Sequence, residues 1–279
     1  MDWRRSKTLL ILLLILLNLF LGGTLLLANT VGTGDAAYVA HAQGVLQTRG
    51  LQYDGTWPDG PAEAGMLGFE NESPVLDKLL KHLLPDATVS QSEDGARVYS
   101  MGSRTLTAGI GIDGKPSVSY RDEQAGYLLD LSSDARRERD MQALLRAIGY
   151  GSYRFVPDRV RETSEGLWLT YVQPYPDGLL FDNRILFRIT AGGLAEMEIR
   201  FHPVQQMLSP VGGGTGAVLT AQQALILSPL RGPLTLEEIS FGWGQGDAGE
   251  LYYSPMWRVI TKDGREMRLD AYTGVLHAP

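Results

Sequence analysis

The four histidines of the chain are the first residues to test for catalysis or metal binding. They are His41, His82, His202 and His277. None lies at a metal-ligand interval such as His-Glu-x-x-His, where two imidazoles share one helix face. The chain has no cysteine, which excludes thiol catalysis, disulfide bonds and cysteine-ligated metals. We therefore predict no metal site and no cofactor.

Motifs for nucleophilic or phosphate chemistry are missing from the sequence as well. There is no Gly-x-Ser-x-Gly nucleophile elbow. The glycine-rich run at residues 212–216 lacks the Gly-Lys-Ser/Thr ending that a phosphate-binding loop needs. Glu196 and Glu198 lie two residues apart, so in a strand they share one face, which is normally solvated. We therefore expect that the protein is not an enzyme.

Aromatic residues gather near the C-terminal end, at Trp243, Tyr252, Tyr253 and Trp257. Two interpretations are open. The rings could pack as core residues and cross-strand pairs, because aromatic side chains bury large apolar surfaces. They could instead form a surface that binds a peptide or a partner protein, since Tyr and Trp combine an apolar ring with a polar group.

Residues 8–28 form an apolar run without one ionisable side chain. As a helix the run would be roughly 31 Å long, which matches the hydrocarbon thickness of a bilayer. Arg4, Arg5 and Lys7 precede it, so the positive-inside rule predicts a cytoplasmic tail over residues 1–7. We expect a single-pass protein of the cell membrane with its C-terminal part outside the cytoplasm. The alternative is a cleaved signal peptide, for which Ala40-His41-Ala42 has the form of a cleavage site.

Small and polar residues lie together within this apolar run. Asn18 is its strongly polar side chain, Gly22 is four residues further on the same helix face, and Gly23 follows. An unpaired amide in lipid is costly, and glycine lets another backbone approach closely. These three residues therefore form a candidate contact with another transmembrane helix. The alternative is a simple anchor in which Asn18 bonds locally.

The charge balance narrows the range of partners. The whole chain carries −7, and residues 1–7 carry three bases and one acid, so the part after the apolar run is acidic. An acidic domain gains nothing from contacts with phosphate groups. Nucleic-acid binding is therefore not expected.

The rest of the chain is predicted to form two α+β units, over residues 29–132 and 133–279, each combining helices with antiparallel strands. The helical patterns lie at residues 35–49, 73–84, 134–148 and 219–225. The strand patterns lie at residues 51–53, 97–101, 104–112, 116–121, 127–131, 167–173, 184–190, 194–201, 238–243, 251–253, 257–261 and 265–271. At the start of the last predicted helix, Thr220 and Gln223 have the spacing of a capping box.

Several segments, in this order and spacing, resemble the YycI (WalI) family. They are Met1-Asp2-Trp3, the run Leu17-Asn18-Leu19-Phe20-Leu21, Val172-Gln173-Pro174-Tyr175, the stretch from Phe181 to Phe187, Leu219 to Leu225, Ser254 to Val259, and Leu269 to Leu276. The last segment also resembles PepSY-like modules of extracytoplasmic regulators.

The resemblance implies a non-enzymatic, membrane-anchored regulator of cell-wall homeostasis in Gram-positive bacteria. It would modulate a sensor histidine kinase of the YycG/WalK type together with a YycH-like paralogue, through transmembrane and extracytoplasmic contacts. The sign of the effect differs among species and is not carried over. The alternative is an extracytoplasmic module of the cell envelope that binds a small ligand or a peptide.

Overall fold

The structure is a computed structural model that describes residues 13–15, 17–18, 36–70, 76–93, 95–110, 116–190, 193–208, 216–246 and 252–277. The helices are α2 (Ala36–Thr48), α3 (Leu76–Leu83), α4 (Asp134–Ala147), the 3₁₀-helix η1 (Gly151–Tyr153) and α5 (Ala221–Leu227). The strands are β1 (Leu51–Tyr53), β2 (Met66–Phe69), β3 (Thr88–Gln91), β4 (Arg97–Met101), β5 (Arg104–Ile110), β6 (Pro116–Asp122), β7 (Val156–Thr163), β8 (Gly166–Tyr175), β9 (Gly178–Thr190), β10 (Gly193–Arg200), β11 (Val204–Leu208), β12 (Leu234–Gly244), β13 (Tyr252–Thr261), β14 (Glu266–Asp270) and β15 (Leu276–His277).

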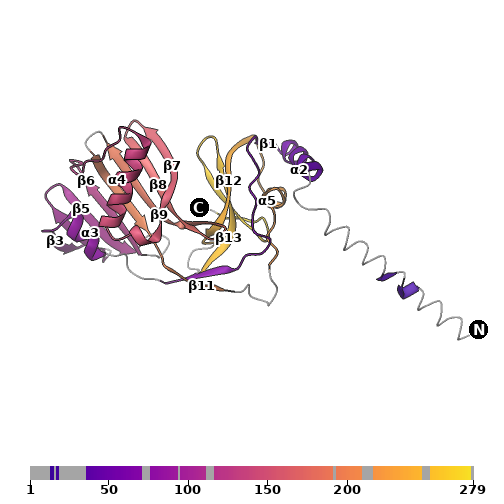
Figure 1. Ribbon diagram of the computed structural model, residues 1–279, viewed down its shortest axis with the longest axis horizontal. Coiled ribbons are helices and arrows are strands. Elements are labelled where there is room, and N and C mark those ends of the chain that lie inside the picture. Colours follow the sequence, from indigo (N-terminus) through magenta and orange to yellow (C-terminus); the bar gives the residue numbers. More distant parts are fainter. Residues whose placement is uncertain are drawn as a thin grey trace, which may run out of the picture.

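The described strands join in one 15-stranded sheet, whose main path runs β11-β2-β13-β12-β9-β10-β6-β5-β4-β3 (Figure 1). Two pairings are parallel, β1 with β12 and β12 with β9, and the others are antiparallel. The predicted fold class, two separate helix-plus-antiparallel-sheet units after a transmembrane helix, is therefore wrong. The alternation of side chains predicts strands, but it carries no information on which distant strands pair.

The predicted transmembrane helix and single-pass membrane localisation are also contradicted. Among the residues that the structure describes, no helix combines the length and apolar character needed to cross a membrane. Residues 13–15 and 17–18 are the described part of the predicted span, and they are helical. The remainder of the span lies outside the described residues.

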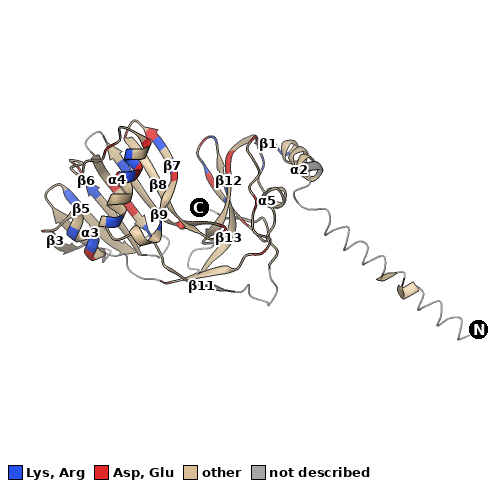
Figure 2. Ribbon diagram, viewed as in Figure 1, with Lys and Arg blue, Asp and Glu red and all other residues tan. Residues whose placement is uncertain are grey.

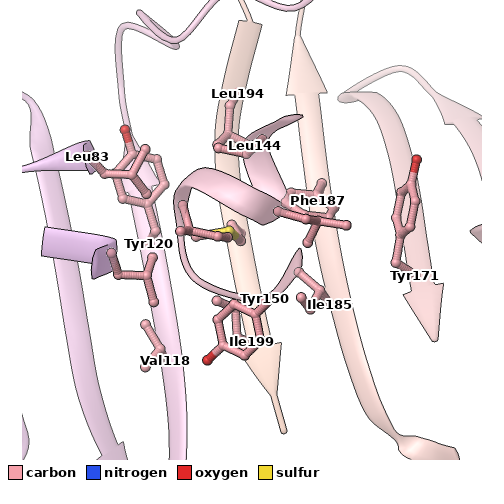
Figure 3. Packing of buried hydrophobic residues seen from close by; sticks show 14 of the residues in the cluster. Leu83, Val118, Tyr120, Leu144, Tyr150, Tyr171, Ile185, Phe187, Leu194 and Ile199 are labelled. Atoms are coloured by element: carbon pink, nitrogen blue, oxygen red, sulfur yellow. The ribbon is translucent and has the colours of Figure 1, made fainter. Parts of the chain in front are cut away.

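The first hydrophobic core lies between helices α3 and α4 and one face of strands β4 to β6 and β8 to β10 (Figure 1). Figure 3 shows Tyr120, Phe187 and Ile199 from the strands pointing toward Leu83 and Leu144 from the helices. Alternate strand residues supply this core, as a sheet covered on one side requires. Burying so many large side chains gives this half its main stabilisation.

The second hydrophobic core is built by α2, α5 and strands β1, β2, β9 and β12 to β14. Residues from the beginning of the chain, such as Leu46 and Leu67, pack here against Trp257 and Leu269 from its end. The two cores therefore draw on both sides of residue 133, where the sequence predicts a division into units. Strand β9 connects the two halves of the sheet.

Candidate binding cleft at the junction of the two halves

Strand β9 changes its neighbour where the two halves meet. Its C-terminal part pairs with β10 up to Arg184, whereas Leu179 and Leu180 pair in parallel with β12 through Gly242 and Trp243. A Cβ atom at Gly242 would collide with the carbonyl oxygen of Leu179, so glycine permits this close approach of the two backbones. The junction is thus part of the hydrogen-bonded sheet.

The buried side chain of Asn183 connects several segments at the junction through hydrogen bonds. Its Nδ2 donates to Gln173 Oε1 and to the His202 carbonyl, both at 2.8 Å. Its Oδ1 accepts from the His202 N–H at 3.0 Å and from the Tyr253 hydroxyl at 2.9 Å. The side chain is fully buried, and these four bonds satisfy its polar atoms. Asn183 therefore links β8, β9, the segment after β10 and β13.

A buried ion-pair network lies beside Asn183 and is centred on Arg258 of β13. The guanidinium donates to both carboxylate oxygens of Asp158 on β7, at 2.7 and 2.8 Å, and to Glu238 on β12 at 2.8 Å. It also lies 4.9 Å from the ring centroid of Phe181. Burial alone would lower the pKa of Arg258, but Asp158 and the other carboxylates raise it above its ordinary value. The guanidinium is therefore charged, and it ties β7 to the second half.

The same network continues through Arg268 of β14. This guanidinium contacts Asp182 at 2.7 Å and Glu266 at 3.0 Å, and Glu266 also contacts Arg159 of β7 at 2.6 Å. Burial alone would raise the pKa of Glu266, but the neighbouring arginines lower it below its ordinary value. Because each of these carboxylates is paired with an arginine, the network links the strands β7, β9, β12, β13 and β14 through ion pairs.

A cleft of about 600 Å³ opens next to this network, between β7 on one side and β12, the end of β13 and the turn after β13 on the other. Figure 2 shows acidic and basic residues together on β7 and acidic residues on β12, the strands that border the cleft. Its lining residues are Asp158, Arg159, Val160, Arg161, Glu237, Glu238, Ile260, Lys262, Asp263 and Gly264. This mixture of both charge signs suits a polar ligand or a protein segment.

The polar groups that line the cleft are carboxylates, arginines and a lysine. Within the described parts of the chain, no cluster of three histidines or carboxylates could hold a metal ion. What the lining offers is ion pairing, hydrogen bonding and the exposed edge of β7.

The structure places three of the four predicted aromatic site residues in the second core. Trp243, Tyr253 and Trp257 are at most 2% exposed, whereas Tyr252 is partly exposed. Each buried ring has its polar group bonded, since Trp243 Nε1 donates to the Gly65 carbonyl at 2.9 Å and Trp257 Nε1 to the Leu219 carbonyl at 2.8 Å. Their positions fit the core interpretation, and a role in partner binding stays a prediction.

The other predicted contact residues lie away from the cleft or outside the described residues. Asn18 is exposed in its short helical piece, and Gly22 and Gly23 lie outside the described residues. His202, one of the four histidines for which no metal or catalytic role is predicted, is buried beside Asn183 and contributes its backbone to the junction.

The residues of the ion-pair network were not predicted from the sequence. One signal was present, because Arg258 interrupts an otherwise apolar strand pattern. A charged residue in such a position is rarely buried unless it is paired. The partners Asp158 and Asp182 are about 100 and 86 residues away along the chain, so the pairing could not be found from local spacing.

Comparisons with known proteins give no family assignment. No family model matches the chain, and no curated protein matches it. Several solved structures are similar to it, two of which follow. An uncharacterized protein from Eubacterium rectale is 12% identical, with a TM-score of 0.49, and the match covers 82% of this chain and 89% of that one. The YpeB C-terminal domain of Bacillus megaterium is 10% identical, with a TM-score of 0.42, and the match covers 73% and 94%. The resemblance to the YycI family, and to PepSY-like modules, stays a prediction.

Proposed function

We propose that the chain is a non-enzymatic regulatory protein that acts by binding, and that its target is a sensor histidine kinase of the YycG/WalK type. In this proposal a YycH-like protein is a second partner. The junction cleft is the contact site. Regulation follows if the chain binds two states of the kinase with different affinity, because only differential binding shifts an equilibrium.

The observation that carries this proposal is where the segments resembling the YycI family lie. Residues 181–187 contain Phe181, Asp182 and Asn183, and residues 254–259 contain Arg258. These two segments meet in the buried network beside the cleft, where the Arg258 guanidinium lies 4.9 Å from the centroid of the Phe181 ring. Segments distant in sequence that share a resemblance thus converge on one place in the fold.

A binding measurement tests the proposal. The chain is immobilised and titrated with the sensor domain of a YycG/WalK-type kinase, with and without a YycH-like protein. Lys262→Glu reverses an exposed charge at the cleft, and Lys78→Glu reverses an exposed charge on α3 as a matched control. We expect Lys262→Glu to weaken binding by about tenfold or more and Lys78→Glu to leave it unchanged. Absence of binding by the unmodified chain would overturn the proposal.

The second candidate is a small-ligand or peptide-binding module. The cleft volume of about 600 Å³ favours it, because ligand sites typically occupy roughly 300–1,000 Å³. Thermal unfolding in the presence of cell-wall peptides tests this candidate. A rise in melting temperature that Lys262→Glu abolishes supports it, and no rise with any peptide contradicts it.

A further inference from the structure

A second pocket lies where helix α2 packs beside strand β1 (Figure 1). Its volume is about 440 Å³, and its lining residues are Gln43, Gln47, Gln52, Tyr53 and Asp54. A narrow recess of about 10 Å³, roughly the room for one water-sized group, shares three of these residues. The recess is lined by Gln43, Leu46, Gln47, Leu51, Tyr53, Trp57 and Leu236. None of these residues lines the cleft beside β7, so the two sites are separate.

The second hydrophobic core holds the walls of this pocket in place. Leu46 of α2 and Leu51 of β1 are buried in that core, and Tyr53 and Trp57 pack against it. The Tyr53 hydroxyl donates to the Thr56 carbonyl at 2.9 Å. The rings of Tyr53 and Trp57 meet edge to face, with their centroids 4.8 Å apart. The two rings are therefore fixed by the protein itself, which lowers the entropy cost of binding a ligand.

Both walls carry side-chain groups that have no hydrogen-bond partner. The amides of Gln43, Gln47 and Gln52 make no hydrogen bond to another described residue. Gln43 and Gln47 are four positions apart on α2, so they lie on one face of the helix. The Trp57 indole N–H is buried and likewise has no acceptor within the described chain. A buried donor of this kind is satisfied when a ligand or a water molecule accepts from it.

The chemical types of these groups indicate the class of ligand. Each amide both donates and accepts, whereas the Asp54 carboxylate accepts only. No lysine or arginine is among the lining residues, so an anion would meet Asp54 without a compensating cation. An apolar ligand would cover the amides without bonding them, which costs free energy. A hydroxyl group donates and accepts as an amide does, and the C–H face of a sugar ring is an apolar surface for an aromatic ring.

We propose that the pocket between α2 and β1 binds an uncharged carbohydrate of one or two sugar rings. The amides and Asp54 bond its hydroxyl groups, and the rings of Tyr53 and Trp57 contact its C–H surface. One hydroxyl enters the recess and accepts from the Trp57 N–H. The volume of about 440 Å³ lies within the range of roughly 300–1,000 Å³ that is typical of ligand sites. The lining comes from short parts of α2 and β1, so the pocket suits a compact ligand better than an extended peptide.

Titration calorimetry of the full chain tests the ligand class. The probes are cellobiose and the disaccharide of N-acetylglucosamine, and the controls are N-acetylneuraminic acid, which carries a carboxylate, and trialanine with blocked ends. We expect at least one disaccharide to bind, and to bind about tenfold or more tightly than either control. Binding of neither disaccharide, or binding of a control that is as tight, would overturn the proposal.

Two variants locate the bound sugar. Gln47→Ala combined with Gln52→Ala should weaken binding about tenfold, because two hydrogen bonds to hydroxyl groups are lost. The matched control is Gln124→Ala, an exposed glutamine after β6, which should leave binding within about twofold. Gln47 and Gln52 are exposed, so the double variant keeps its core, and thermal unfolding checks that it is folded. Unchanged affinity of the double variant would show that the sugar binds elsewhere.

The Trp57 N–H is tested by Trp57→Phe, which keeps an aromatic ring and removes the donor. We expect this variant to bind the sugar about fivefold more weakly. Affinity equal to that of the unmodified chain would exclude the hydrogen bond in the recess.

This inference goes beyond the proposed function and can fail separately from it. If the kinase domain binds and no carbohydrate does, the carbohydrate site falls and the regulatory function stands. If a carbohydrate binds and no kinase domain does, the kinase proposal falls and the carbohydrate site stands. Lys262→Glu, which lies in the cleft, should leave sugar binding unchanged.

Discussion

The first hydrophobic core and the junction of the two halves hold strands together by different interactions. In the core, Tyr150 and Phe201 meet edge to face with ring centroids 5.4 Å apart, and stabilisation follows from buried apolar area. At the junction, Arg258 is equally buried but is held by Asp158 and Glu238. The comparison teaches that the core should respond to side-chain volume, and the junction to charge and pH.

The largest effect is expected from removing a large side chain in the first core. Phe187 is fully buried, with its ring 5.7 Å from that of Tyr171. Phe187→Ala should lower the free energy of unfolding by about 4 kcal/mol, because it removes apolar contacts and leaves a cavity. Phe187→Leu should cost far less. Urea denaturation measures both, and equal losses would contradict control by volume.

Breaking the junction is expected to cost somewhat less. Asp158→Ala leaves Arg258 buried with Glu238 as its remaining acidic partner, so the free energy of unfolding should fall by about 3 kcal/mol. The double variant Asp158→Leu with Arg258→Met removes both charges and should recover much of the loss. Urea denaturation of the single and double variants tests this. A double variant less stable than Asp158→Ala would argue against the charge interpretation.

The local sequence predicts the helices and strands of each half better than it predicts how these elements are arranged. The predicted helix at residues 134–148 corresponds to α4, and the capping box of Thr220 and Gln223 is present at α5. The segment at residues 127–131 is not a strand and forms only one bridge, between Tyr127 and Leu194. Strand β7 was missed, because its proline and charged residues do not resemble a strand pattern.

The cleft could not be predicted for a related reason. One wall is β7, and the other is β12 with the end of β13 and the turn after it. The walls are brought together by the parallel pairing of β12 with β9 and by an ion pair between residues 100 positions apart. Such long-range contacts leave no periodic trace in the sequence. The aromatic residues near the C-terminal end were visible in the sequence, but their burial depends on α2 and β2 from the beginning of the chain.

Acid should weaken the junction through Glu266. Its pKa is lowered in the folded protein, because the charges of Arg268 and Arg159 outweigh the effect of burial. A lowered pKa contributes stability above the unfolded pKa of about 4.3, and this contribution is lost as the pH falls through the folded value. We expect the free energy of unfolding to decline from pH 6 to pH 3. Glu266→Gln should flatten this decline.

The control for this pH dependence is Glu162→Gln, which removes an exposed carboxylate of β7 outside the network. Urea denaturation of both variants across the same pH range shows whether the pH dependence of stability arises at the junction or at the surface. Equal flattening by Glu162→Gln and Glu266→Gln would show that acid sensitivity does not arise in the network.

The smallest effects are expected at the helix caps, which again differ between the halves. At α5, Thr220 Oγ1 accepts from the Gln223 N–H at 3.3 Å, and Gln223 Oε1 accepts from the Thr220 N–H at 2.9 Å. At α4, Ser133 Oγ accepts from the exposed Arg136 N–H at 3.3 Å. Thr220→Ala should cost about 1 kcal/mol, and Ser133→Ala about half of that, because water can replace the lost bond at α4 more easily than at α5. Thermal unfolding of both variants, with Thr220→Ser as the variant that keeps the hydroxyl, ranks the two caps. A larger loss for Ser133→Ala would mean that α4, and not the more buried α5, depends more on its cap.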